Sequence, residues 1–280
     1  MCLVAYERGN TNIKYIDPDH PLWAYVLITN DCNMSCQYCY NQHNHLDKIS
    51  LSNYINILDR LETIGIKQVT LSGGEPVLHP DFEQILIVTK SKGFKTHVLT
   101  NGLEVSKILA ADQAGLIDQL QFNWNIETYK QLIPAIKKIQ RSRIAVTIPG
   151  TASNIESLQT LVSVAYQLGI HKLRIWELCG AGKTDTSCSI QDYDTLFQQY
   201  VPPEYTFKQS YDPDVTGDLH IPCLIASGVT LFINTNGDIV RCVAEIDSPK
   251  ITNIFNNTAE EVLQQYRSYV ATLPKKCFAR

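Results

Sequence analysis

Apolar residues follow two alternating patterns between residues 24 and 176. In the first pattern they recur every three or four residues, as in a helix buried on one side, and Leu51, Tyr54, Ile55, Leu58 and Leu61 are an example. The same spacing predicts helices over 81–91, 103–111, 127–140 and 154–168. In the second pattern, short apolar runs predict strands. These runs lie at 24–28, 68–71, 95–99, 119–123, 144–148 and 172–176.

This alternation predicts parallel strands joined by helical crossovers, and therefore an α/β fold. Six such units favour a partial (β/α)6 barrel that is open on one side, with its chemistry at the carboxyl ends of the strands. The alternation stops near residue 187, and a different pattern begins near Pro222. We therefore expect an N-terminal extension (1–23), a core (24–185), a connecting segment (186–221) and a C-terminal module (222–280).

Composition narrows the class of protein. The chain has 280 residues, 44% of them hydrophobic, which suits one large globular core with a small appendage. A formal net charge of −4 gives no electrostatic reason to expect a nucleic acid or an anionic membrane as partner. No apolar stretch reaches the length of a membrane span, and no signal peptide is evident. Nine cysteines, an odd and clustered set, favour a reducing cytoplasm over a disulfide framework.

Three cysteines directly after the first predicted strand are the most informative motif. Cys32, Cys36 and Cys39 have the spacing C-x3-C-x2-C. Three thiolates this close can bind three irons of a four-iron cluster and leave the fourth iron open to another ligand. The alternative is a zinc site, which usually takes four ligands and often pairs two C-x2-C units.

This motif, with Tyr38 as the aromatic residue before the third cysteine, resembles the signature of the radical S-adenosylmethionine (radical SAM) enzymes. The resemblance implies a partial (β/α)6 barrel, a [4Fe-4S] cluster on the three cysteines, and SAM chelated to the open iron. It also implies reductive cleavage of SAM to a 5′-deoxyadenosyl radical, which abstracts hydrogen from a substrate. A reductant such as flavodoxin or ferredoxin would then be a partner.

Further residues match the elements that bind SAM in that family. Gly73, Gly74 and Glu75 follow the second strand, where consecutive glycines let the backbone approach a ligand closely. The resemblance assigns this turn, with Tyr38, to cofactor binding. It also implies that Asn125, where many relatives have serine, contacts the ribose or carboxylate. Leu178 matches a position that covers the adenine, and an ordinary core leucine is the alternative.

Other candidate residues carry less specific signals. Cys179 lies after the sixth strand, where substrate-facing groups gather, and is a candidate hydrogen-atom donor or metal ligand. A buried structural cysteine is the alternative for Cys179. The same interpretations apply to Cys188, with less support. We assign Trp124 to packing and His79 to the entry of a helix rather than to a ligand set.

The C-terminal region has a second cysteine pattern. Residues 229–242 predict a β-hairpin around an Asn-Gly turn, a helix is expected over 258–271, and Cys277 follows. The spacing C-x13-G-x4-C, from Cys223 to Cys242, resembles the first half of the SPASM domain, in the shortened form called twitch. The resemblance implies one auxiliary iron–sulfur cluster on Cys223, Cys242 and Cys277, beside the substrate chamber. Its fourth ligand stays open among Cys179, Cys188, a non-cysteine group and the substrate.

The substrate class stays open at this point. SPASM and twitch proteins often crosslink or epimerise ribosomally made peptides, so a peptide is the first expectation. A radical SAM dehydrogenase or cyclase acting on a free small molecule, such as a sugar, a nucleotide or an antibiotic intermediate, is the alternative. A non-catalytic metal-binding interaction protein is a third possibility. The Gly-Gly-Glu-Pro turn argues against this third class, because a structural metal site needs no SAM pocket.

Overall fold

The computed structural model describes residues 21, 23–39, 47–170, 172–176, 206–208, 228, 230–242 and 248–273. Its centre is one ten-stranded sheet with the order β10-β9-β8-β1-β2-β3-β4-β5-β6-β7. The strands are β1 (Trp23–Thr29), β2 (Gln68–Gly73), β3 (Lys95–Thr100), β4 (Gln119–Asn123), β5 (Arg143–Pro149), β6 (Lys172–Trp176), β7 (Thr206–Lys208), β8 (Thr230–Ile233), β9 (Asp238–Val240) and β10 (Lys250–Asn253).

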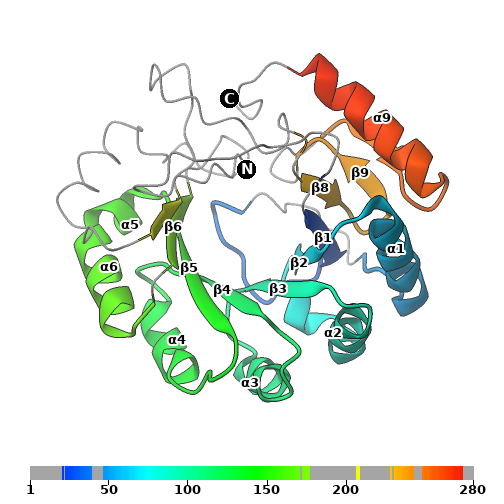
Figure 1. Cartoon of the computed structure of the whole chain (residues 1–280). Helices are drawn as coiled ribbons and strands as arrows, with labels where there is room; N and C mark the ends of the chain where they lie inside the picture. Colours follow the sequence, from blue (N-terminus) through cyan, green and yellow to red (C-terminus); the bar gives the residue numbers. More distant parts are fainter. Residues whose placement is uncertain are drawn as a thin grey trace.

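The eight neighbouring strands from β8 to β7 are all parallel, and only β9 and β10 join in antiparallel pairs. The sheet curves, and its helices lie on the outer side (Figure 1). They are α1 (Leu51–Ile64), α2 (Phe82–Ser91), α3 (Val105–Gln113), α4 (Tyr129–Ile136), α5 (Ala152–Glu156), α6 (Leu158–Gln167) and α9 (Ala259–Thr272), with a short 3-10 helix η1 (Pro76–Leu78). The α/β fold with a parallel sheet, expected from the alternation, is confirmed.

Local sequence explains where α1 begins and ends. The Ser50 hydroxyl accepts a hydrogen bond from the backbone N–H of Asn53, which caps one of the free donors of the first turn. Gly65 ends the helix in the left-handed conformation with φ of 93°, and its N–H bonds to the last turn. The buried face carries Tyr54, Ile57, Leu58, Leu61 and Ile64, close to the set expected from helical spacing.

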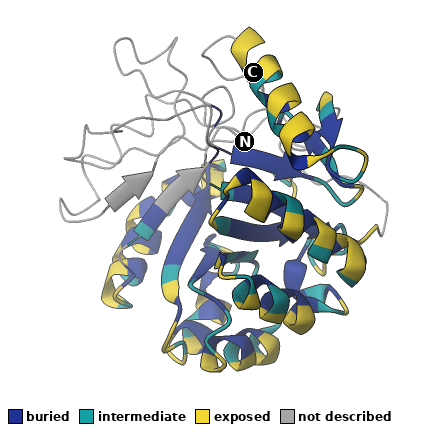
Figure 2. Ribbon diagram, turned by 45° about the vertical axis from the view of Figure 1, so that its right-hand side comes forward, coloured by how far each residue is buried: buried dark blue, intermediate teal, exposed yellow. Residues whose placement is uncertain are grey.

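The core lies between the strands and the inner faces of the helices. Figure 2 shows the strands buried and the outward sides of the helices exposed. Six of the seven residues of β1 are buried, as expected for a central strand covered on both faces. Since β1 has β2 on one side and β8 on the other, it holds the segment that follows it, residues 30–39, at the middle of the sheet.

Three elements differ from the sequence-based expectation. The helix expected over 127–140 is shorter: α4 contains Pro134 and ends at Ile136. The helix expected over 154–168 is two helices: α5 begins after its Thr151 cap, and the helical conformation is interrupted at Ser157, before α6. The strand β7 lies in the segment that was expected to connect the core to the C-terminal module.

The C-terminal hairpin is confirmed, but it continues the core sheet. Strand β8 pairs in parallel with β1, from Trp23 opposite Thr230 to Val26 opposite Ile233. Helix α9 lies beside α1 on the outer side (Figure 1). The boundaries predicted for the four segments stay predictions. In the part of the chain that the structure describes, none of the helices combines the length and apolar character that crossing a bilayer requires.

Candidate active site

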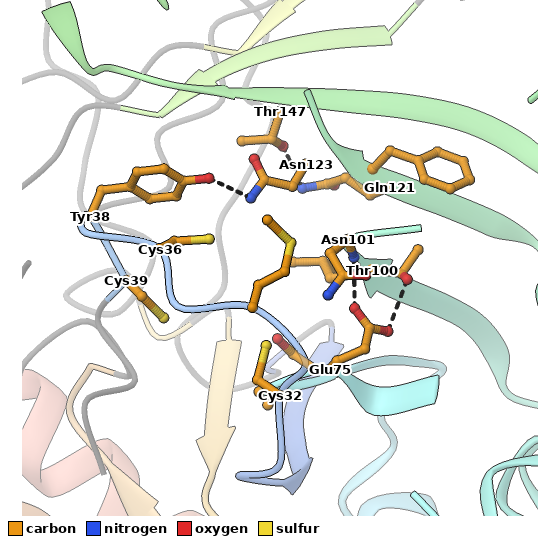
Figure 3. Close-up of a pocket in the computed structure, with 16 residues that line it drawn as sticks. Cys32, Cys36, Tyr38, Cys39, Glu75, Thr100, Asn101, Gln121, Asn123 and Thr147 are labelled. Atoms are coloured by element: carbon orange, nitrogen blue, oxygen red, sulfur yellow. Dashed lines mark hydrogen bonds between the residues drawn. The ribbon is translucent and has the colours of Figure 1, made fainter. Parts of the chain in front are cut away.

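A pocket opens at the carboxyl ends of the parallel strands. Its walls come from the cysteine loop after β1 and from the ends of β2, β3, β4 and β5. Figure 3 shows Cys32, Cys36 and Cys39 on one side of this space, with the polar side chains of the strands opposite. The expectation that the cysteine motif and the Gly-Gly-Glu turn meet at this end of the sheet is therefore met by the geometry.

The three thiols of the cysteine loop all line the pocket. All three are free cysteines, and a short turn joins two of them through the Cys39 N–H, which bonds to the Cys36 carbonyl at 3.1 Å. Among the described residues, no three histidine, cysteine or acidic groups are close enough to hold a single metal ion. A single zinc ion needs its ligands about 2.3 Å from one centre, whereas a four-iron cluster binds each thiolate to a different iron. Three free thiols that line one pocket match the donor set of such a cluster.

Protonation of the thiols bears on metal binding, because iron binds thiolates. Partial burial raises the pKa of the Cys32 thiol above its usual value. A hydrogen bond from the Met34 backbone acts in the opposite direction, while the nearby Glu75 carboxylate and Cys36 add to the rise. A cluster bound here displaces that proton.

The two glycines of the turn lie against the backbone that follows β1. Gly73 has φ of 141°, and a side chain there would overlap the carbonyl oxygen of Thr29. A side chain on Gly74 would overlap the carbonyl oxygens of Asn30 and Asp31. The missing side chains thus make room for the protein's own backbone after β1. Both glycines still line the pocket, where their backbone groups remain candidates for binding the SAM amino group.

The buried Glu75 carboxylate connects the turn after β2 to the end of β3 through hydrogen bonds. Its Oε1 accepts hydrogen bonds from the Thr100 hydroxyl at 2.9 Å and the Val77 N–H at 3.2 Å, and its Oε2 accepts from the Asn101 N–H at 2.7 Å (Figure 3). Burial raises the pKa of Glu75 to about 7, although these hydrogen bonds oppose the rise. The carboxylate faces the pocket, as predicted, but three internal donors already hold it.

Tyr38 joins the cysteine loop to β4. Its hydroxyl accepts hydrogen bonds from the amide nitrogens of Asn123 at 2.8 Å and Asn125 at 3.1 Å. Burial, with the charge of Cys36 and a hydrogen bond to it, raises the pKa of Tyr38, so the phenol stays protonated. The oxygen of the Asn125 side chain accepts from the N–H groups of Glu127 and Thr128. Asn125 therefore holds the local chain, and its contact with SAM stays a prediction.

Three polar residues of the pocket wall were not predicted from the sequence: Gln121 and Asn123 on β4, and Thr147 on β5. Gln121 donates from Nε2 to the Thr147 hydroxyl at 2.7 Å. The signal that would have revealed them is the alternation in Gln119-Leu-Gln-Phe-Asn123. A strand whose apolar side chains pack against helices turns its polar side chains to the inside of the barrel.

His79 and Trp124, which the sequence analysis assigned to structural roles, both form internal hydrogen bonds. His79 donates from Nε2 to the Ile49 carbonyl at 2.8 Å, and its Nδ1 accepts from the Asp81 N–H at 3.0 Å. Burial lowers the pKa of His79, which fits a neutral ring used on both sides. Trp124 is fully buried and donates to the Leu161 carbonyl at 3.0 Å.

Several predicted site residues lie outside the described residues. They are Leu178, Cys179, Cys188, Cys223 and Cys277. Cys242 is described, is buried, and follows β9, as expected. Because β9 runs antiparallel to β8 and β1, Cys242 lies near the amino end of β1, at the opposite end of the sheet from Cys32. The seven residues of β1 separate these ends by roughly 20 Å. Cys242 is not among the described residues that line the pocket, and an auxiliary cluster beside the substrate chamber stays a prediction.

Residues 26–144 match the sequence model of the radical SAM superfamily. The chain therefore carries a radical SAM domain. The match covers the cysteine loop, the Gly-Gly-Glu turn and the ends of β3 and β4, which are the parts of the radical SAM domain that form the pocket.

Two sequence relatives differ in what they cover. This chain is 40% identical over 76 residues to an S-adenosylmethionine-dependent nucleotide dehydratase of Selenomonas ruminantium, across 27% of this chain and 28% of that protein. It is 26% identical over 276 residues to the PqqA peptide cyclase of Gluconobacter oxydans, across 88% of this chain and 77% of that protein. The chain thus spans less than a third of the first relative and most of the second.

Solved structures share the fold. The structure of Streptococcus suis SuiB bound to precursor peptide SuiA has a TM-score of 0.71 at 16% identity, over 91% of this chain and 67% of SuiB. The structure of anSMEcpe with bound AdoMet has a TM-score of 0.63 at 12% identity, over 89% of this chain and 79% of that one. The likeness in fold extends over about nine tenths of this chain.

Proposed function

We propose that this protein is a radical SAM enzyme that forms a 5′-deoxyadenosyl radical from SAM and modifies a peptide. The observation that carries the proposal is the set of three free thiols on one side of a pocket that the Gly-Gly-Glu turn also lines, within the radical SAM domain. Cys32, Cys36 and Cys39 would hold a [4Fe-4S] cluster. When bound, that cluster supplies the electron that splits the sulfonium of SAM.

The chain's own side chains would orient the cofactor. Backbone groups of Gly73 and Gly74 line the pocket and are proposed to bind the SAM amino group. Glu75 fixes Thr100 and Asn101 at the end of β3, and so shapes the wall beside that turn. Tyr38, held by two asparagines, lines the pocket on the side of the cysteine loop.

A peptide is the favoured substrate because the peptide cyclase matches the chain over most of its length. The SuiB structure, with its bound precursor peptide, has a fold compatible with this choice. A nucleotide or another free small molecule is the second candidate. It is favoured by the higher identity to the nucleotide dehydratase, although that similarity covers only 27% of the chain.

The activity is tested by anaerobic reconstitution with iron and sulfide, reduction with dithionite, and addition of SAM. We expect 5′-deoxyadenosine by chromatography, and a change in the electron paramagnetic resonance spectrum of the reduced cluster when SAM binds. Cys36→Ala should abolish both, whereas Cys2→Ala, at a cysteine with no assigned role, should leave both unchanged. Absence of 5′-deoxyadenosine from iron-loaded wild-type protein would refute the proposal.

Cys223, Cys242 and Cys277 are proposed to hold an auxiliary cluster, with the fourth ligand open among Cys179, Cys188, a non-cysteine group and the substrate. Iron analysis should then give about two four-iron clusters per chain, falling to one in Cys223→Ala/Cys242→Ala. An unchanged iron content in the double variant would rule this cluster out. A flavodoxin or ferredoxin in a reducing cytoplasm is the proposed electron source.

The substrate class is tested by supplying candidates to the active enzyme. Short peptides encoded beside the gene are the first candidates, and nucleotides the second. A crosslink removes two hydrogen atoms from the peptide, and epimerisation in deuterated water introduces deuterium, so mass spectrometry detects either reaction. Turnover of a nucleotide, with no peptide modified, would select the second candidate.

A further inference from the structure

We infer that Asn123 and Thr147, on the β4–β5 wall of the pocket, form a subsite for an uncharged carboxamide of the substrate. This inference rests on the proposed function, since it concerns the substrate of the same pocket. It goes further by naming the chemical group that the wall recognises.

Asn123 presents an acceptor that nothing satisfies. Its amide nitrogen donates to the Tyr38 hydroxyl at 2.8 Å, which fixes the orientation of the amide plane. Its oxygen is buried and has no hydrogen-bond partner in the part of the chain that the structure describes. A buried acceptor without a donor costs about 1–3 kcal/mol. A ligand that brings an N–H group to this oxygen recovers that cost.

Thr147 presents a donor next to this acceptor. Its hydroxyl oxygen accepts the Gln121 amide at 2.7 Å, so the hydroxyl proton is left to point elsewhere. Asn123 and Thr147 are direct partners in the pairing of β4 with β5, and their side chains both line the pocket. Figure 3 shows the Asn123 amide nitrogen turned toward Tyr38 and its oxygen on the side of Thr147.

An acceptor beside a donor matches the edge of a carboxamide, which carries an N–H and a C=O on adjacent positions. A carboxylate offers only acceptors, and would leave the Asn123 oxygen unpaired and facing another oxygen. A single hydroxyl has one proton and must reach both groups from one atom. The wall therefore favours an amide over an acid of the same shape.

The charges of the side chains that line the pocket also favour an amide over an acid. Among the described residues that line the pocket, none is a lysine, an arginine or a histidine. Apart from the three thiols and the Tyr38 phenol, the titratable group there is Glu75, whose carboxylate is held by internal donors. Among these described lining residues, a phosphate or carboxylate meets no positively charged side chain. An asparagine or glutamine side chain, or a peptide amide, meets no such penalty.

The test measures binding of small probes to the full chain by saturation-transfer NMR, which does not require the cluster to turn over. The probes are acetamide, acetate and isopropanol, each with and without S-adenosylhomocysteine. We expect acetamide to bind at least about tenfold more tightly than acetate, because one unpaired buried acceptor is worth that ratio. This preference should persist with S-adenosylhomocysteine present.

Variants locate the binding. Asn123→Ala and Thr147→Val should each weaken acetamide binding about tenfold, and Thr147→Ser, which keeps the hydroxyl, should retain it. Asn53→Ala, on the exposed side of α1, is the matched control and should change nothing. Folding of each variant is checked by circular dichroism, and the Ser/Val pair at one position separates a lost hydroxyl from a lost fold.

Four results would overturn the inference: equal or tighter binding of acetate, equal binding of isopropanol, no binding of any probe, or no effect of the Asn123 and Thr147 changes. Complete displacement of acetamide by S-adenosylhomocysteine would also overturn it, because the Asn123 oxygen would then belong to the cofactor's site. Failure of the proposed function appears separately, as iron-loaded protein that forms no 5′-deoxyadenosine.

Discussion

Glu75 combines a buried carboxylate with three hydrogen-bond donors, two at the end of β3 and one in η1. Burial raises its pKa from 4.5 to about 7, so the folded protein binds a proton more tightly than the unfolded chain does. The stability linked to that proton is present below about pH 4.5 and is lost as the pH rises through about 7. A shift of this size is worth on the order of 3 kcal/mol.

Glu75→Gln should remove this pH dependence. In the metal-free wild-type protein, we expect the free energy of unfolding in urea to fall between pH 5 and pH 8, by roughly 3 kcal/mol at most. The Gln variant should show a flatter profile, because its side chain does not titrate. Glu83→Gln, at an exposed position of α2, is the control and should follow the wild type. Equal slopes for Glu75→Gln and the wild type would show that Glu75 does not titrate in this range.

At the scale of elements, the fit between β2 and the segment after β1 fixes the cysteine loop. The N–H of Gly74 bonds to the Thr29 carbonyl at 2.8 Å, and the N–H of Glu75 bonds to the Asp31 carbonyl at 2.7 Å. These bonds hold the backbone one residue before Cys32. The space that they require is available only because residues 73 and 74 have no side chain.

Gly73→Ala should therefore disrupt iron binding as well as folding. The new side chain overlaps the Thr29 carbonyl at a positive φ, so we expect a loss of about 2–4 kcal/mol. Gly65→Ala is the matched control, because Gly65 also has a positive φ but open space around it, and should cost only about 1 kcal/mol. Urea unfolding and iron content measure the two effects. Equal losses in the two variants would mean that backbone strain alone, and not the contact with Thr29, matters at residue 73.

Sequence patterns predicted those elements whose cause is local. The face and the ends of α1 follow from its apolar spacing, its Ser50 cap and its Gly65 stop. The C-terminal hairpin follows from Asn236-Gly237, where Gly237 has φ of 75°. That Cys32, Cys36 and Cys39 line one pocket also has a local cause, since the three cysteines lie within eight residues of one another.

Features set by contacts between distant segments were not predictable in this way. The Gly-Gly pair indicated a close approach, but the approaching atoms belong to the backbone after β1, which no local pattern reveals. The unpaired Asn123 oxygen exists only because Tyr38, far away in sequence, takes the amide nitrogen. The pairing of β8 with β1 likewise joins segments that are far apart in the sequence, so no local pattern predicts it.

At the scale of the molecule, the core and the C-terminal region share one sheet, so they should unfold together. Tyr266 on α9 donates to the Thr230 carbonyl of β8 at 2.8 Å, and the neighbouring Val262 is fully buried. A cavity at residue 262 should then weaken strands that α9 does not belong to, because β8 pairs directly with β1.

Val262→Ala should lower the free energy of unfolding by about 2 kcal/mol. Hydrogen exchange followed by mass spectrometry should show faster exchange in the slowest amides of β1 as well as in α9. Gln264→Ala, at an exposed position of the same helix, should leave exchange in β1 unchanged. Faster exchange confined to residues 248–273 would indicate a C-terminal unit that opens independently.

The position of β1 between β2 and β8 also bears on the order of events during synthesis. β1 precedes the other strands of the sheet along the chain, yet one of its two neighbours belongs to residues 230–233. Pairings between segments this far apart form late and slowly, because a long loop must close first. The sheet around the strand that supports Cys32 is therefore completed only after residues 230–233 have been made. Iron loading in the cell is expected to follow the pairing of β8 with β1.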